Sequence, residues 1–240
     1  MEQNPYEKVA TERVDVASEA DVEARLDFIR RTYLLLAGAI MAFVAIEFAI
    51  FQVGLAGPLV KMMLGWGGAS WMITLFLFVG VGWIANRLAL SQVSEKVQYA
   101  GLGLYVVAEA VIFVPLMFMA AHYSDPTVIP TAGIITMSVF SVLTGYVFVT
   151  KQDFSFLGPF LAIAAAVAFG AIIASFIFGF QLGIIFAMAM IMLASGYIVY
   201  YTSNILHHYH TEQHAAAALA LFSAVAMLFY YVLFALLGSD

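Results

Sequence analysis

Residues 157–178 read LGPFLAIAAAVAFGAIIASFIF and contain no charged side chain. A helix rises about 1.5 Å per residue and the hydrocarbon core of a bilayer is about 30 Å thick, so about 20 apolar residues cross it. Lipid offers no hydrogen-bond partners to the backbone, which leaves only helices and closed β-barrels as spanning structures. The stretch is continuously apolar rather than alternating, and this pattern favours a membrane-spanning helix.

Six further apolar runs of similar length surround this one. The seven spans are predicted at residues 32–52, 69–88, 99–121, 129–149, 157–178, 182–206 and 215–237. Of the 240 residues, 64% are hydrophobic and 10% are charged, and the mean hydropathy is +1.00. These values lie far outside the range of soluble domains. The sequence therefore predicts an all-α integral membrane protein, a bundle of seven transmembrane helices.

Small side chains mark where membrane helices can approach one another closely. Residues 215–226 of the last span are rich in alanine, so we expect the seventh transmembrane helix to lie at the centre of the bundle. Two glycine pairs, Gly80 with Gly82 and Gly101 with Gly103, are predicted to permit close helix packing. Neither pair follows a strand, as a nucleotide-binding turn requires.

The segment ahead of the first span is acidic and polar. Eight of the fifteen acidic residues fall within residues 1–28, a distribution that argues against nucleic acid as a partner. This segment has few large apolar groups to bury and is predicted to be a largely disordered tail, followed by a transmembrane domain over residues 29–240. Residues 21–31 form either an amphipathic helix on the membrane surface or a helical extension of the first span, and the extension is preferred.

The basic residues predict the orientation of the chain. Eight of the nine lysines and arginines lie on the side of the N-terminal tail, and Lys61 lies on the other. Cytoplasmic segments carry such an excess, so the N-terminus is predicted to be cytoplasmic and the C-terminus periplasmic, in a bacterial inner membrane. The acidic leader lacks the pattern of a cleaved secretory signal.

Two carboxylates lie well within the apolar runs, Glu109 and Glu47. Glu109 is placed near mid-membrane without a lysine or arginine at its depth, where the charged form of a carboxyl group is costly. It either binds a proton or a cation, or is a protonated side chain bonded to a neighbouring hydroxyl or carbonyl, and the sequence leaves both interpretations open. Glu47 is placed nearer the outer surface, where reaching toward water or lining a vestibule would lower the cost of its charge.

A histidine-rich segment connects the sixth and seventh spans. His207 and His210, or His210 and His214, have spacings that zinc can use on one helix face. Neither a cysteine nor a fixed third ligand completes a zinc site. The segment is therefore interpreted as a polar interfacial loop, and no metal is predicted.

Catalytic constellations are missing from the spans. None of the seven contains an aspartate, which excludes an intramembrane aspartyl dyad, and the chain has no cysteine to act as a nucleophile. The histidines lie in loops or at helix ends rather than beside a membrane serine. A non-enzymatic protein without a cofactor is expected.

Three short segments stand out from the apolar background: IRRTYLLL at residues 29–36, KQDFSFLG at 151–158 and SGYIVYYTSNILH at 195–207. In this order they resemble the Bax inhibitor-1 family of seven-helix membrane proteins, in particular its bacterial branch that includes the modulator of the membrane protease FtsH. The resemblance covers nearly the whole chain after the tail and implies an inner N-terminus and a central seventh helix. The polar motif residues that it carries over are Lys151, Asp153, Ser155, Thr202 and Asn204. Of these, Asp153 or Ser155 is expected to cap the fifth span.

The resemblance also implies where an ion sensor would lie, and this chain departs from the family there. Calcium-leak members carry an acidic pair, whose positions fall on Tyr201 and on Ala224 or Val225 in this sequence. None of these side chains supplies a carboxylate to Ca²⁺, which prefers several oxygen ligands. Arg87 matches the basic partner of the first acid, and without that acid it is interpreted as an anchor at the inner membrane surface.

Two functions follow. The first is a stress-related, non-enzymatic modulator or substrate of a membrane protease such as FtsH, which would engage the N-terminal tail. The alternative is a pH-sensitive calcium or proton leak channel built around Glu109 and Glu47. The missing acidic pair favours the first, because the branch that modulates FtsH also lacks the second acid.

Overall fold

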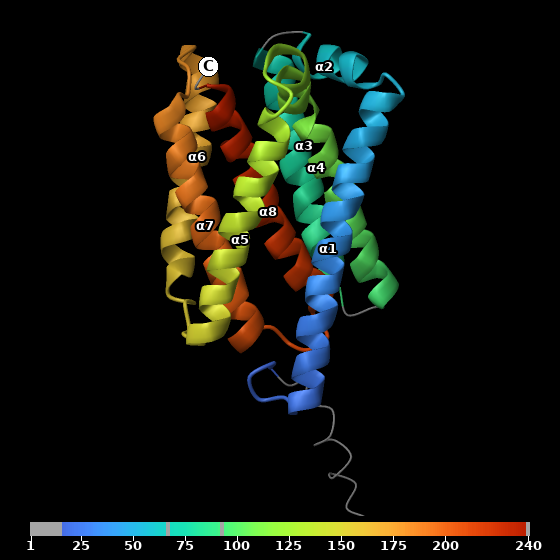
Figure 1. Ribbon diagram of the computed structural model, residues 1–240, viewed down its shortest axis with the longest axis vertical. Helices are drawn as coiled ribbons and strands as arrows, with labels where there is room; N and C mark the ends of the chain where they lie inside the picture. The colour runs from blue at the N-terminus through green and yellow to red at the C-terminus, as the bar shows by residue number, and fades with distance from the viewer. Residues whose placement is uncertain (1–15, 66–67, 92–93, 239–240) are drawn as a thin grey trace, which may run out of the picture.

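The computed structural model describes residues 16–65, 68–91 and 94–238. Within these residues the chain folds into eight helices. Seven of them are long and apolar enough to cross a membrane, and they stand side by side as a bundle (Figure 1). The prediction of an all-α protein with seven membrane-spanning helices is confirmed.

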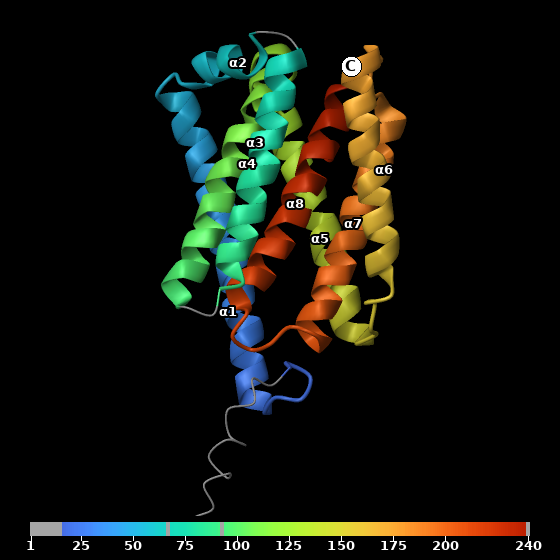
Figure 2. The same cartoon turned by 180° about the vertical axis from the view of Figure 1, so that it is seen from behind.

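The bounds of the helices extend the predicted spans at several ends. The seven membrane helices are α1 (Val22–Gln52), α3 (Gly68–Ala89), α4 (Glu95–Tyr123), α5 (Val128–Thr150), α6 (Leu157–Phe178), α7 (Ile184–His207) and α8 (His214–Leu237). Successive membrane helices run in opposite directions, so α1 begins and α8 ends at opposite ends of the bundle (Figures 1 and 2). The end at which α1 begins is termed the tail end, and the other is the far end.

One helix was not predicted. The short helix α2 (Ala56–Leu64) lies across the far end, between α1 and α3 (Figure 1). Pro58 falls in the first turn of α2. Proline is tolerated there because the first amides of a helix have no partner within the helix.

The helix of the first span starts well before the membrane segment predicted from residue 32. It begins at Val22 and therefore includes residues that were assigned to the tail, ahead of the boundary predicted at residue 29. The ion pair of Arg31 with Asp27, 2.8 Å apart, lies within this extension and links successive turns. The preferred interpretation of a helical extension is confirmed, while residues 1–15 of the predicted tail lie outside the described residues.

The last helix, α8, runs through the middle of the bundle in both views (Figures 1 and 2). It packs against α1, α3, α4, α5 and α7. Four successive alanines near its start, Ala215, Ala216, Ala217 and Ala218, are at most 2% exposed. Their small side chains allow neighbouring helices to approach closely, and the predicted central position of the seventh membrane helix is confirmed.

Only one of the predicted close-packing glycines lies at a tight helix contact. A Cβ on Gly101 of α4 would lie 2.6 Å from the carbonyl oxygen of Ala85 on α3, whereas a Cβ on Gly80 or Gly103 would meet nothing within 4 Å. A Cβ on Gly82 would make a side-chain contact at 3.4 Å. The packing prediction is therefore confirmed for Gly101 and wrong for Gly80 and Gly103, whose helix faces are turned away from their neighbours.

Candidate functional site

Glu109 lies midway along α4, and its carboxyl group faces the inside of the bundle. The residue is 5% exposed. Tyr105 lies one helical turn earlier, and its hydroxyl group is beside the carboxyl group. The second carboxyl oxygen, Oε2, is buried and has no partner among the described residues. The carboxyl group thus has a hydroxyl neighbour on its own helix, and Oε2 can accept a hydrogen bond.

A cavity of about 740 Å³ borders Glu109. Residues of α3, α4, α6, α7 and α8 line it, and most of them are aromatic or aliphatic. Hydroxyl-bearing residues of four helices line it, namely Tyr105 on α4, Ser175 on α6, Tyr197 and Tyr201 on α7, and Ser223, Tyr230 and Tyr231 on α8. We refer to this space as the Glu109 cavity.

The Glu109 cavity contains two of the positions at which the family resemblance places an acidic pair. Tyr201 and Ala224 both line it, whereas Val225 lines a different cavity on another face of α8. Tyr201 and Ala224 are therefore the positions that share one space. Glu109 introduces a carboxyl group into the same space from α4.

The cavity extends along the bundle toward the far end. Gln181, in the connection after α6, and Phe234, close to the end of α8, line its far-end part. Toward the tail end the lining stops at Tyr201, whose ring stacks on that of Tyr197 with centroids 5.5 Å apart. Glu109 lies between these two limits, because it is near the middle of α4.

Glu47 lines a second cavity, of about 470 Å³, between α1, α4, α5 and α8. The residue is 3% exposed, and neither of its carboxyl oxygens has a partner among the described residues. Thr136 of α5 lines the same cavity with a buried hydroxyl that is also without a partner. Glu47 therefore does not extend to the surface, and its carboxyl group is buried at the cavity wall. We refer to this space as the Glu47 cavity.

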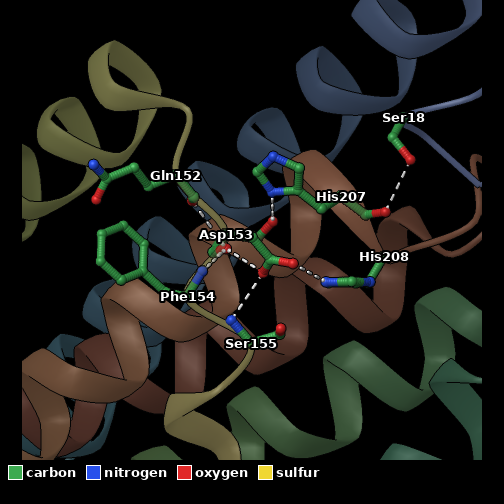
Figure 3. Close-up of polar contacts among 8 residues, drawn as sticks. Ser18, Gln152, Asp153, Phe154, Ser155, His207 and His208 are labelled. Atoms are coloured by element: carbon green, nitrogen blue, oxygen red, sulfur yellow. Dashed lines mark hydrogen bonds and ion pairs between the residues drawn. The ribbon is translucent and has the colours of Figure 1, made fainter.

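The second and third motif segments meet at the tail end around Asp153, which points between Ser155 and His208 (Figure 3). Its Oδ1 accepts the Ser155 N–H at 2.9 Å, and its Oδ2 lies 3.1 Å from Nε2 of His208. The hydroxyl of Ser203 on α7 accepts the Phe154 N–H at 2.8 Å. Desolvation of Asp153 raises its pKa, but the hydrogen bonds from Ser155 and His208 outweigh this effect and hold the pKa below its usual range.

The role of the second motif differs from the predicted helix cap. The residue ahead of α6 is Phe156, and no side chain caps the helix there. Asp153 instead bonds within the turn before α6, and Lys151 ends α5 in a left-handed conformation with φ 52°. These motif residues shape the connection between α5 and α6.

The first and third motif segments also meet. The hydroxyl of Tyr33 on α1 lies beside the hydroxyls of Thr144 on α5 and Thr202 on α7. Farther along α7, the Asn204 carbonyl oxygen accepts the N–H groups of His208 and Tyr209 and so ends the helix. All three motif segments therefore lie toward the tail end, where they connect α1, α5, the α5–α6 connection and α7.

Arg87 lies on α3 close to the tail end and is exposed. Its guanidinium group stacks over the Trp83 ring, 4.7 Å from the ring centroid. An arginine with an aromatic neighbour at this level supports the interpretation of Arg87 as an anchor at the membrane surface.

The histidines of the α7–α8 connection have separate partners. Nδ1 of His207 lies 3.0 Å from the Ser203 carbonyl oxygen, and Nε2 of His214 lies 3.1 Å from the Tyr99 hydroxyl. The backbone N–H of His210 donates to the Gln213 side chain. Within the described part of the chain, no group of three or more histidines and acids could hold a metal ion.

Two important polar residues were missed by reasoning from the sequence. Tyr105 could have been found, because a spacing of four residues from Glu109 places both on one helix face. Thr136 carries no such signal, because its proximity to Glu47 depends on how α5 packs against α1 and α8.

Comparison with known proteins agrees with this architecture. The family model described as inhibitor of apoptosis-promoting Bax1 matches residues 25–240. LIFEGUARD 4 of Arabidopsis thaliana is 29% identical over 219 residues, which cover 86% of this chain and 83% of that protein. Bax inhibitor 1 of Schizosaccharomyces pombe is 29% identical over 168 residues, or 68% and 60% of the two chains.

A bacterial protein is similar over a shorter region. An uncharacterized protein of Pseudomonas aeruginosa is 37% identical over 84 residues, which cover 34% of this chain and 37% of that protein. No solved structure matches the chain. Because the family model covers almost the entire sequence, this multi-pass membrane protein belongs to the Bax inhibitor-1 family.

Proposed function

We propose that this protein is a pH-sensitive leak channel in which Glu109 binds the permeating ion. The observation that carries the proposal is the position of Glu109, midway along α4, on the wall of a cavity within the bundle, where its Oε2 has no partner among the described residues. Ionisable groups at such depth are costly, and they are typical of ion and proton pathways. A glutamate that faced lipid would have no access to such a pathway.

The chemistry around Glu109 favours a proton over calcium. Ca²⁺ takes about six to eight oxygen ligands, with carboxylates among them. Near Glu109 the cavity lining adds the hydroxyls of Tyr105, Tyr201 and Ser223, and no second carboxylate lines the cavity among the described residues. A single carboxyl group with hydroxyl neighbours is sufficient to accept and release a proton, so proton leak is the first form of the proposal and calcium leak is the second.

This proposal reverses the order suggested by the sequence alone. The loss of the acidic pair at Tyr201 and Ala224 argued against ion conduction. In the folded protein, however, Glu109 shares a cavity with both positions. Although Tyr201 and Ala224 replace the acidic pair, the Glu109 cavity still contains one carboxyl group, which comes from α4.

Flux through reconstituted protein tests the proposal. Purified protein in liposomes is expected to dissipate a pH gradient, and Glu109→Gln is expected to abolish this flux. Glu212→Gln is the matched control, because Glu212 is an exposed acid in the α7–α8 connection. Equal flux in wild type and E109Q would remove Glu109 from the mechanism, and the absence of proton and Ca²⁺ flux from wild type across the pH range would reject the channel.

We also propose a second, non-enzymatic function, that of a stress-related modulator of an FtsH-type membrane protease. The supporting observation is the attachment of residues 16–20 at the tail end. The Ala17 N–H donates to the Tyr209 carbonyl oxygen at 2.9 Å, and the Ser18 hydroxyl donates to the His207 carbonyl oxygen at 3.0 Å (Figure 3). The acidic segment ahead of residue 16 therefore departs from a fixed point, where a protease could engage it.

Two truncations test the protease proposal. Removal of residues 1–20 is expected to lengthen the cellular half-life and to prevent co-purification of the protease. Removal of residues 1–15 leaves the attachment in place and is expected to have the same effect if the acidic segment itself is engaged. An unchanged half-life in both truncations, with no protease co-purified with the full chain, would reject this function.

We propose that the chain lies in a bacterial inner membrane with its tail end in the cytoplasm. The distribution of basic side chains supports this orientation. Among the described residues, the tail end carries Arg25, Arg30, Arg31, Arg87, Lys96 and Lys151, and α2 at the far end carries Lys61. Such an excess is typical of cytoplasmic segments.

A further inference from the structure

The Glu47 cavity combines an unsatisfied carboxyl group with apolar walls. Of the side chains that line it, Glu47 and Thr136 are the polar ones, and neither has a partner among the described residues. Buried polar groups are nearly always hydrogen-bonded, because an unmade bond costs free energy. A bound molecule that supplies donors would satisfy both.

The walls of the cavity suit a positive charge. Five phenylalanine side chains from α1 and α8 line it, namely Phe43, Phe48, Phe51, Phe222 and Phe229. Aromatic faces attract ammonium groups through the ring quadrupole, and a carboxylate adds a charge-assisted hydrogen bond. Among the described residues, no lysine or arginine lines the cavity, so none of them provides a cation for Glu47 there.

The cavity opens toward lipid between α1 and α5. On α1, Val44 and Phe48 line it and are 53% and 66% exposed, whereas Glu47 between them is 3% exposed. On α5, Met137 lines it and is 43% exposed, next to the buried Thr136. The exposed members form the mouth and the polar members form the floor. A molecule would therefore enter from the bilayer with its polar group directed inward.

The size of the cavity limits the occupant to a small molecule. A volume of about 470 Å³ falls in the range of about 300 to 1,000 Å³ that is usual for ligand pockets. An acyl chain of a lipid would fill the apolar part but leave the Glu47 oxygens without donors. A quaternary ammonium carries charge but no N–H donor, and an alcohol carries one donor but no charge.

We propose that the Glu47 cavity binds a membrane-dissolved amphiphilic amine, whose protonated nitrogen donates to Glu47 and Thr136 and whose apolar body lies among the phenylalanines. The chemical class is a primary or secondary amine with an aliphatic or aromatic body. The site is separate from the Glu109 cavity, which lies on another face of α8, and the proposal does not depend on ion leak.

Photoaffinity labelling tests the site. The full-length protein in phosphatidylcholine nanodiscs is exposed to a primary alkylamine that carries a diazirine in its chain. We expect saturable labelling of α1 and α5 residues at the mouth, including Val44 and Met137, and competition by the same amine without the diazirine. The matched alcohol and the matched trimethylammonium compound are expected to label these residues about tenfold less, because each lacks the charge or the donor.

Three variants connect the labelling to the polar floor. Glu47→Gln is expected to reduce labelling by about tenfold or more. Thr136→Val is expected to reduce it by less, because the Thr136 hydroxyl is a neutral acceptor whereas the Glu47 carboxylate is charged. Glu47→Asp keeps the carboxylate and is expected to retain labelling, which separates loss of the ligand from loss of the fold. Glu109→Gln is expected to label like wild type, whether or not it affects flux.

Several outcomes would overturn the proposal. Equal labelling by the alcohol and the amine would show an unselective lipid-filled pocket. Labelling that resists competition, that maps away from α1 and α5, or that is unchanged in a folded E47Q protein would show that Glu47 recognises no amine.

Discussion

Oδ2 of Asp153 and Nε2 of His208 lie 3.1 Å apart and join the connection before α6 to the connection after α7 (Figure 3). The two residues are 55 positions apart in the sequence. Their contact fixes the tail end of α7 relative to the start of α6, the most peripheral helix of the bundle. The side chains are about half exposed, so the pair is expected to contribute modestly to stability.

Asp153 is predicted to make the stability of the protein depend on pH in the acidic range. Desolvation raises its pKa, but the hydrogen bonds from Ser155 and His208 lower the pKa by more than this, so the net pKa is below the ordinary value. A carboxyl group with a lowered pKa stabilises the folded state above its unfolded pKa of about 4, and this contribution is lost as the pH falls through the folded pKa. Asp153→Asn is therefore expected to cost about 0.5 kcal/mol near neutral pH.

Thermal unfolding in detergent checks this prediction. The difference between wild type and D153N should shrink as the pH is lowered from about 7 to about 3. Glu212→Gln, which removes an exposed acid in the α7–α8 connection, provides the control and should show no such convergence. A constant difference between wild type and D153N across the range would contradict the role given to the carboxylate.

Gly101 is predicted to be required for the contact between α3 and α4. A Cβ at this position would lie 2.6 Å from the Ala85 carbonyl oxygen, a backbone atom that cannot rotate away. Gly101→Ala is expected to cost about 1 to 3 kcal/mol, since overpacking forces the helices apart. Thermal unfolding in detergent measures this cost.

Gly103 supplies the matched control two residues away. It has open space around the corresponding position, so Gly103→Ala is expected to be neutral or to stabilise the helix by up to about 1 kcal/mol. Equal destabilisation by both substitutions would show that the approach of α3 to Gly101 does not determine the effect.

Much of the fold could be predicted because a bilayer permits few backbone structures to cross it. Long apolar runs identified all seven membrane helices, and alanines identified the central one. The short helix α2 was missed because it is too brief to span a membrane and contains Pro58. The ends of the helices were less certain, since backbone hydrogen bonds continue past the apolar part, as at the start of α1.

The candidate site could be predicted only in part. Glu109 was recognised as a buried acid, but α4 is apolar around its whole circumference, so its sequence has no polar face to show which side Glu109 occupies. The shared cavity with Tyr201 depends on the packing of α4 against α8 and on the position of α7. That arrangement comes from contacts between distant segments, which no local pattern encodes.

The orientation of the bundle can be determined because the chain has no cysteine. Single cysteines at Lys61 in α2 and at Glu212 in the α7–α8 connection would lie at opposite ends of the bundle. In intact spheroplasts a membrane-impermeant maleimide is expected to label Lys61→Cys and not Glu212→Cys, because the tail end carries the basic excess. Lysed spheroplasts should show labelling of both, and the reverse pattern in intact spheroplasts would place the tail end outside.

Tyr201 is predicted to limit the selectivity of the proposed leak. It lines the Glu109 cavity from α7, at a position where the family resemblance places an acid. Tyr201→Asp would bring a second carboxyl group into this space, and Ca²⁺ prefers several carboxylate oxygens. The ratio of Ca²⁺ flux to proton flux in liposomes is therefore expected to rise by about tenfold, which corresponds to about 1.4 kcal/mol of added preference.

Val225→Asp is the control, because Val225 lines the Glu47 cavity instead and should leave the ratio unchanged. If a folded Y201D protein, verified by size-exclusion chromatography, keeps the wild-type ratio, Tyr201 and Glu109 do not act on the same ion.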